Sequence, residues 1–269
     1  MFTSIQPHNE RPAAVWSSGG DAYDEVSRQI SGALQHCVWR LAPKPGENIL
    51  DLATGTGWTS RLIARTGAKV TGADIAAELI ASAKERAQAE KLAINYAVGD
   101  AEKLPFADRS FDAVSSTFGV MFVSRPEAAA GEIARVCKTG GRMALTTWLP
   151  DSGVFKMFQV MRAYMPPPPT PAPPSPFEWG RRERIQELFG RDFDLKFETG
   201  VATYYDRSGV DAWDKFVTGY GPTKALAASL DEAKRANLRR DFIAFHDGYK
   251  TDLGFAVPRE YLLTIGKRR

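Results

Sequence analysis

The residues Ile49-Leu-Asp51-Leu-Ala-Thr-Gly55-Thr-Gly57-Trp-Thr-Ser60 join three local patterns in succession. An apolar run typical of a buried strand leads into a turn with two glycines, and a helix pattern follows. Glycines lack the Cβ atoms that would hold a ligand away from the backbone, and a helix N-terminus presents free N–H groups. Asp51 adds a carboxylate at the end of the strand. The stretch therefore predicts a site for a nucleoside-type cofactor.

The same turn differs from the turn that binds a dinucleotide. A dinucleotide fingerprint has a third glycine three residues after the second, but here that residue is Ser60. Asp51 would repel a pyrophosphate, and the stretch contains no Lys or Arg to neutralise one. A cofactor with a cationic amine and no phosphate fits better. A nicotinamide-dependent oxidoreductase is the less favoured alternative.

Five segments together resemble the class I, seven-stranded S-adenosylmethionine-dependent methyltransferases, and within them the small-molecule group that includes the ubiquinone/menaquinone-biosynthesis C-methyltransferases. The resemblance covers residues 14–149 approximately and rests on Asp51-Leu-Ala-Thr-Gly55-Thr-Gly57, Val70-Thr-Gly-Ala-Asp74-Ile, Gly99-Asp100-Ala-Glu-Lys-Leu-Pro-Phe106, Phe111-Asp112-Ala-Val with Ser115-Ser-Thr-Phe-Gly119, and Arg135-Val-Cys-Lys-Thr-Gly-Gly141. It implies an α/β/α sandwich whose seven-stranded sheet is mostly parallel, with the last strand antiparallel between the fifth and sixth. It also implies S-adenosylmethionine as cofactor, S-adenosylhomocysteine as product, and no metal.

Two acidic positions outside the glycine turn carry most of the binding prediction. Asp74 ends the second strand pattern, ~20 residues after the turn, where an acidic side chain receives ribose hydroxyls. In relatives, the turn at Asp100 flanks the adenine; a turn cap is the alternative role. Trp16 either anchors the N-terminal segment or closes over the cofactor. The predicted cofactor-binding residues are Trp16, Asp51, Ala53, Thr54, Gly55, Gly57, Ser60, Asp74, Ile75, Asp100, Ala101, Glu102, Thr117 and Phe118.

Composition excludes several classes of protein. The 35 Lys and Arg against 32 Asp and Glu leave a charge of +3, too balanced for electrostatic nucleic-acid binding. The apolar loop Phe118–Phe122 lacks the Asn/Asp-Pro-Pro-aromatic pattern of many methyltransferases that act on nucleic-acid bases. Cys37 and Cys137, both at apolar positions of helix patterns, have no spacing for zinc or a disulfide. With no membrane-spanning stretch, the sequence predicts a cytoplasmic protein.

The periodicities predict one domain, residues 1–269, in four parts: an extended arm at 1–21, a cofactor-binding half at 22–149, a proline-rich lid at 150–180, and a substrate-side half at 181–269 with a helical insertion at 208–248. Strands are expected at 48–53, 69–74, 93–98, 111–117, 142–148, 195–205 and 259–266. Helices are expected at 22–41, 58–67, 76–91, 126–138, 153–165 and 181–189.

The lid indicates the kind of acceptor. Segment 153–165 carries Phe and Met at helical spacing, and the prolines of 166–176 predict a stiff polyproline excursion. We interpret the two as one cover over the site, with a plain linker or a proline-binding partner as alternatives for the prolines. The acceptor is then a small, apolar or aromatic molecule, methylated at oxygen, carbon or nitrogen.

Methyl transfer by in-line displacement needs orientation more than a catalytic side chain. His246 is a weak hypothesis for a general base, because a lone histidine is usually structural. A catalytically silent cofactor-binding accessory protein is the main rival function. The sequence leaves a homodimer open.

Overall fold

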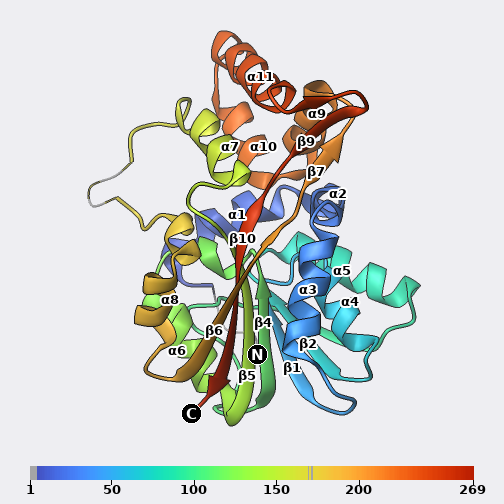
Figure 1. Cartoon of the computed structure of the whole chain (residues 1–269), viewed down its shortest axis with the longest axis vertical. Helices are drawn as coiled ribbons and strands as arrows, with labels where there is room; N and C mark the ends of the chain where they lie inside the picture. The colour runs from blue at the N-terminus through green and yellow to red at the C-terminus, as the bar shows by residue number, and fades with distance from the viewer. Residues whose placement is uncertain (1–4, 169, 171) are drawn as a thin grey trace.

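A seven-stranded sheet forms the centre of the computed structural model, which describes residues 5–168, 170 and 172–269 (Figure 1). Its strand order is β3-β2-β1-β4-β5-β10-β6, and β10 runs antiparallel to both of its neighbours. The strands are β1 (Asn48–Leu52), β2 (Lys69–Asp74), β3 (Ile94–Val98), β4 (Phe111–Thr117), β5 (Cys137–Trp148), β6 (Phe193–Val201) and β10 (Glu260–Arg268). The predicted fold class is confirmed.

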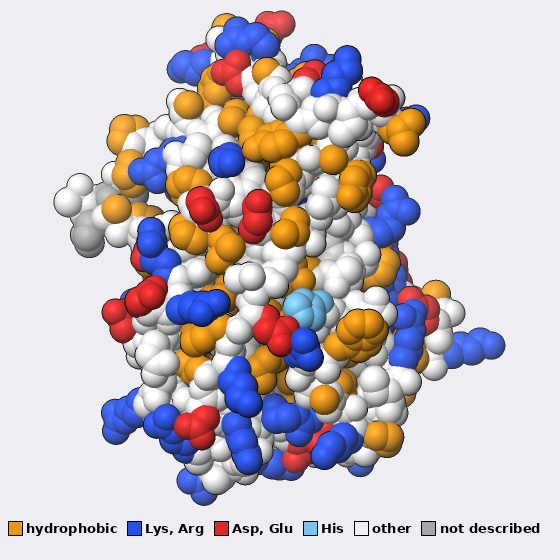
Figure 2. Space-filling model, in the orientation of Figure 1, with side chains coloured by type: hydrophobic (Ala, Val, Ile, Leu, Met, Phe, Trp, Pro, Cys, Tyr) orange, Lys and Arg blue, Asp and Glu red, His pale blue; other side chains and the backbone are white. Residues whose placement is uncertain are grey.

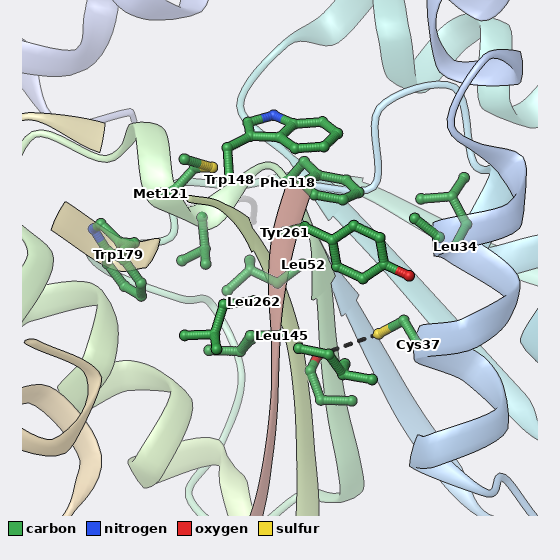
Figure 3. Packing of buried hydrophobic residues seen from close by; sticks show 14 of the residues in the cluster. Leu34, Cys37, Leu52, Phe118, Met121, Leu145, Trp148, Trp179, Tyr261 and Leu262 are labelled. Carbon is green, nitrogen blue, oxygen red and sulfur yellow. Dashed lines mark hydrogen bonds between the residues drawn. The ribbon is translucent and has the colours of Figure 1, made fainter. Parts of the chain in front are cut away.

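Helices cover both faces of this sheet. In Figure 1, α3 (Ser31–Leu41), α4 (Trp58–Ala64) and α5 (Ala77–Ala89) lie on one side, and α6 (Pro126–Val136) and α8 (Arg182–Phe189) on the other. The central strands are apolar because both of their faces are buried. Figure 3 shows this core, in which the Cys37 thiol of α3 lies 3.7 Å from the carbonyl oxygen of Ala144 in β5.

A cap of helices stands at one end of the sheet (Figure 1). It contains α7 (Gly153–Arg162), where a helix is expected at 153–165. It also contains α9 (Gly209–Gly219), α10 (Gly221–Ser229) and α11 (Glu232–Asp247), as the helical pattern of 208–248 predicts. A small antiparallel sheet, ordered β7-β9-β8, joins it and was not predicted; its strands are β7 (Tyr204–Asp206), β8 (Lys250–Thr251) and β9 (Gly254–Val257). In the part of the chain that the structure describes, no helix has the length and apolar character to span a membrane.

The N-terminal segment is helical, which corrects the expected extended arm. It forms η1 (Pro7–Asn9), α1 (Glu10–Ser17), η2 (Gly20–Ala22) and α2 (Tyr23–Arg28). Its prolines were interpreted as breakers, but Pro7 begins a helical turn and Pro12 lies in the first turn of α1. A first turn tolerates proline because its N–H groups have no intrahelical partner.

Three expected elements have different bounds. The single helix expected at 22–41 is interrupted at Gln29 and Ile30, between α2 and α3. The strand expected at 195–205 is divided into β6 and β7. The helix expected to reach Lys138 ends at Val136, so Cys137 lies in β5 and not in a helix; it pairs with Phe111 beside a register shift. Tertiary strand pairing overrides the local helix pattern there.

The proline segment does not cover the site, contrary to the expectation. Its described residues from 166 to 175 are exposed, and Figure 1 shows the segment looping away from the cap. Residues 169 and 171 lie outside the described part of the chain. After the segment, η4 (Pro176–Gly180) returns to the core through Phe177 and Trp179. Of the expected lid at 150–180, α7 does cover a cavity, because its Val154 and Met157 line it.

Candidate active site

A cavity opens at the carboxyl ends of β1, β2 and β4, with about 720 Å³ of empty space including its open mouth. This position is the one that open α/β sheets use for binding. The N-terminal helices contribute Asn9, Pro12, Trp16 and Tyr23 to its lining. Nine predicted residues also line it: Trp16, Ala53, Gly55, Asp74, Ile75, Asp100, Ala101, Thr117 and Phe118.

The backbone is strained where strands meet this cavity. Ala53 after β1 and Phe118 after β4 adopt positive φ angles of 54° and 58°, which are uncommon for residues other than glycine. Gly55 also has a positive φ, and an added Cβ there would lie 3.3 Å from Cε1 of Tyr23. A Cβ on Gly119 would collide with Ala53. Such conformations concentrate at ligand sites, and here they place backbone atoms at the surface of the cavity.

Asp51 lies behind the cavity wall. Its carboxylate is fully buried and accepts hydrogen bonds from the hydroxyls of Thr54 (2.6 Å), Ser60 (2.7 Å) and Ser115 (3.0 Å). Burial raises its pKa, and the three hydroxyls oppose that rise. Gly57 also faces the interior, because a Cβ there would collide with the Tyr96 hydroxyl. These predicted residues therefore hold the shape of the turn from behind.

Asp74 lies in the wall itself. Its two carboxylate oxygens accept hydrogen bonds from the N–H groups of Gly55 (2.8 Å) and Ala76 (2.9 Å), which join the glycine turn to the end of β2. Burial raises its pKa to about 6, against the stabilising effect of these N–H groups. Each carboxylate oxygen has a second lone pair that can accept a ligand hydroxyl.

The acidic turn after β3 holds the N-terminal segment. Asp100 accepts hydrogen bonds from the backbone N–H of Gln6 (3.0 Å) and from the Asn9 amide (2.9 Å). Glu102 accepts one from the N–H of Arg125 (2.8 Å), and its Oε2 lies 2.6 Å from Nε2 of His8. The Asp100 carboxylate is thus already hydrogen-bonded to the N-terminal segment, although the residue also lines the cavity. The contacts of Gln6, His8 and Asn9 span more than ninety positions, so no local pattern indicated Asn9.

A second cavity of about 460 Å³ adjoins the first. Tyr23, Phe118 and Phe122 line both. Figure 3 shows the ring of Trp148 stacked on Phe118, with 3.7 Å between the centroids. The lining of this cavity comes from α2, α7, α9, the end of β5 and residues next to β4 and β10: Tyr23, Val26, Ser27, Ile30, Phe118, Phe122, Trp148, Val154, Met157, Phe216, Tyr220 and Arg259.

Trp16 closes the junction of the two cavities. Its ring contacts Phe122, Tyr220 and Tyr23 at centroid distances of 5.1, 5.6 and 6.1 Å. The sequence singled out Trp16 but missed Tyr23 and Tyr220. The apolar stripe of 22–41 included Tyr23, yet nothing in that stripe separated a cavity residue from a core residue.

His246 lies in an aromatic cluster of the cap. It is buried, its Nδ1 is 2.8 Å from the carbonyl oxygen of Phe242, and its ring packs on Phe245 and Phe255. Burial lowers its pKa to about 4, so the imidazole is neutral at neutral pH. His246 is not among the residues that line the first or the second cavity. These contacts give His246 a packing role and no support as a general base.

The charges of the first cavity fit a cationic cofactor. Among its described lining residues, Asp74 and Asp100 are acidic, and none is Lys or Arg. S-adenosylmethionine has a cationic sulfonium, an amino-acid group with an ammonium and a carboxylate, ribose hydroxyls and no phosphate, and its net charge is positive. The carboxylates suit these groups, and the glycine turn provides the close backbone approach. A pyrophosphate would meet two carboxylates and no cation.

Comparisons with known proteins agree with this fit. A methyltransferase-domain family matches residues 50–145. The chain is 35% identical, over 95% of its length and 93% of the relative's, to an uncharacterized protein of Mycobacterium tuberculosis. It is 28% identical to a ubiquinone/menaquinone biosynthesis C-methyltransferase of a Ruegeria species, with 93% and 95% covered. A crystal structure of a putative methyltransferase from Bacillus halodurans is similar in fold, with a TM-score of 0.61 at 20% identity over 87% of this chain and 97% of that one.

The relatives match the chain over most of its length, and the family match spans the strands and turns that build the first cavity. The seven-stranded sheet with its antiparallel β10 completes the agreement. This chain belongs to the class I S-adenosylmethionine-dependent methyltransferases.

Proposed function

We propose that this protein transfers a methyl group from S-adenosylmethionine to an oxygen, carbon or nitrogen atom of a small acceptor with an apolar or aromatic body. The first cavity holds the cofactor and the second holds the acceptor. One observation carries the proposal: the two cavities meet at Tyr23, Phe118 and Phe122, so a ligand in one lies next to a ligand in the other. The mostly aromatic and aliphatic lining of the second cavity favours an apolar body.

The wall residues have separate roles in this proposal. Asp74 accepts hydrogen bonds from the ribose hydroxyls, while Ile75, Leu79 and Ala101 supply apolar contacts. Strained backbone at Ala53 and Phe118 lets the chain approach the ligand closely. When bound, S-adenosylmethionine supplies an electrophilic methyl group on a cationic sulfonium.

The aromatic junction orients the reactants and excludes water. Trp16, Phe122 and Tyr220 pack around the place where the cavities meet. Their π faces favour a neighbouring cation. Burial raises the pKa values of Tyr23 and Tyr220, so both phenols stay protonated and serve as donors at neutral pH. Orientation in a dry site is therefore the main contribution of the chain.

Calorimetric titration with S-adenosylhomocysteine tests the cofactor assignment, with NADH as the competing ligand. We expect saturable binding of S-adenosylhomocysteine and none of NADH. Mass spectrometry of ligands that co-purify with the protein then identifies acceptors for assays with methyl-labelled cofactor. Absence of S-adenosylhomocysteine binding by folded protein would refute the proposal. Binding without turnover of any co-purified acceptor would favour the catalytically silent accessory protein.

A further inference from the structure

One cation lines the second cavity and has no charged partner among the described residues. Arg259 immediately precedes β10, and only 4% of it is exposed. Its backbone carbonyl accepts a hydrogen bond from the N–H of Ala202 (2.9 Å), which fixes where the side chain begins. The guanidinium is therefore a built-in part of the cavity wall.

The contacts of Arg259 leave hydrogen-bond donors free. The guanidinium carbon lies 4.1 Å from the ring centroid of Tyr204 and 5.7 Å from that of Phe216. Stacking on a ring face uses the π electrons and leaves the in-plane N–H groups available. Nη1 reaches Oε1 of Gln29 at 3.5 Å, a long hydrogen bond, and the buried Nη2 has no partner in the described part of the chain.

Neighbouring ionisable groups do not neutralise Arg259. Asp206 accepts hydrogen bonds from Tyr204 (2.7 Å) and Lys215 (2.6 Å), so that carboxylate already has a cation. His246 is neutral, and the described lining of the second cavity contains no Asp, Glu or His. Burial lowers the pKa of Arg259 to about 10, which still leaves it charged at neutral pH.

A buried cation without a counter-ion is unfavourable for folding, and a buried donor without an acceptor adds to the cost. A ligand oxyanion would remove both penalties at once, because a carboxylate accepts the paired N–H groups of a guanidinium. The first cavity has carboxylates and no Lys or Arg in its described lining. A ligand whose net charge is negative is thus repelled from the first cavity and attracted to the second.

We propose that the acceptor is an aromatic or otherwise apolar molecule that carries an anionic oxygen, and that Arg259 binds this oxygen in the second cavity. The inference rests on the proposed function and narrows its acceptor class. Tyr204 and Phe216 hold the guanidinium plane, and the apolar wall at Trp148 and Met157 receives the body of the acceptor. Arg259 is a specificity-determining residue in this arrangement.

A pair of probes with the same ring system tests the proposal. The affinities of 2-naphthoate and its neutral analogue 2-naphthamide are measured by calorimetry at pH 7.5, with and without saturating S-adenosylhomocysteine. We expect the wild-type protein to bind naphthoate at least tenfold more tightly than naphthamide. Arg259→Met should remove this preference by weakening naphthoate binding alone, and Arg259→Lys should keep part of it.

Arg207→Met is the matched control, because it also removes a positive charge but its side chain is 84% exposed and lies outside the cavity lining. It should leave both affinities unchanged. Failure of naphthoate to bind, equal affinities on the wild-type protein, or a retained preference in a folded Arg259→Met variant would each overturn the inference. If that variant unfolds, the wild-type comparison and Arg259→Lys decide. S-adenosylhomocysteine titration reports on the proposed function separately, because the naphthoate preference is also measured without it.

Discussion

Asp74 links cofactor binding to proton release. Its pKa in the folded protein is about 6, above its ordinary value of 3.8, because its carboxyl is buried. Between these two values the folded chain binds more protons than the unfolded chain. The stability that this group contributes is therefore fully present below pH 3.8 and is lost as the pH rises through 6. A ligand with hydroxyl groups favours the ionised form of Asp74, because hydroxyls donate stronger hydrogen bonds to a carboxylate than to a protonated carboxyl group.

We predict that S-adenosylhomocysteine affinity falls about tenfold as the pH is lowered from 7 to 5, because the ionised fraction of a group with a pKa near 6 falls by roughly that factor. Calorimetry at a series of pH values measures this dependence. Asp74→Asn is the control; it should bind weakly at every pH and lose most of the dependence. A wild-type affinity that does not change with pH would contradict the role of Asp74.

Asp74→Ala should weaken S-adenosylhomocysteine binding by ~1.5–3 kcal/mol for each lost charge-assisted hydrogen bond. The variant also removes the acceptor of the Gly55 N–H, so part of the loss will come from a less ordered glycine turn. Circular dichroism establishes whether the fold is intact. Undiminished affinity in a folded Asp74→Ala protein would mean that another group holds the ribose.

At the scale of elements, two glycines let the N-terminal helices lie against α9. A Cβ on Gly19 would collide with the carbonyl oxygen of Gly219, and a Cβ on Gly219 would collide with that of Ala22. This close contact positions Trp16 and Tyr23 at the junction of the cavities. Because the colliding atoms belong to the backbone, neither helix can relieve the overlap by turning a side chain.

Gly219→Ala should therefore lower the free energy of unfolding by about 1–3 kcal/mol and weaken S-adenosylhomocysteine binding. Gly131→Ala is the matched control: Gly131 lies on the exposed side of α6, and a Cβ there meets nothing within 4 Å. This control should be neutral or more stable by about 0.5–1 kcal/mol, because alanine favours helix. Urea denaturation measures both. Equal stability of the two variants would show that the helices adjust without cost.

At the scale of the whole molecule, the N-terminal helices complete the wall of the first cavity, the proposed cofactor site. Asp100 and Glu102, at the end of β3, hold Gln6, Asn9 and His8, and α1 then crosses the carboxyl end of the sheet. Strand pairing within the large sheet does not involve this segment. The N-terminal residues thus contribute to the closure of the site more than to the central fold.

Deletion of residues 1–17 should leave the sheet folded, as judged by circular dichroism, while S-adenosylhomocysteine affinity falls tenfold or more. The deletion removes three wall residues of the first cavity, Asn9, Pro12 and Trp16, and exposes the ligand to water. Asn9→Ala is the milder comparison, since it removes one hydrogen bond to Asp100. An unchanged affinity in the truncated protein would show that the site is complete without these helices.

The two cavities also differ in the sign of the charged side chains that line them. The first cavity carries carboxylates and the second carries Arg259. On the face of the molecule in Figure 2, Lys and Arg gather at the lower end and also lie at the upper end, with Asp and Glu among them. The charges of the two cavities fit the proposed pairing of a cationic cofactor with a small anionic acceptor.

Local chemistry determined the parallel sheet and the edge at which the cofactor site forms. The apolar run of β1, the glycine turn and the spacing to Asp74 are short-range features, and all of them can be recognised within about 25 residues of sequence. The same reasoning placed the first four strands within one residue of their ends. It also indicated the antiparallel last strand through the family resemblance.

Only the tertiary structure decided which side chains face the cavities. Asp51 and Asp74 both end strands beside the glycine turn, yet the Asp51 carboxylate is surrounded by hydroxyls in the core while Asp74 lines the cavity. Asn9, Tyr220 and Arg259 come from distant parts of the chain. Their positions follow from packing between the N-terminal helices, α9 and the start of β10, and such long-range contacts leave no periodic pattern in the sequence.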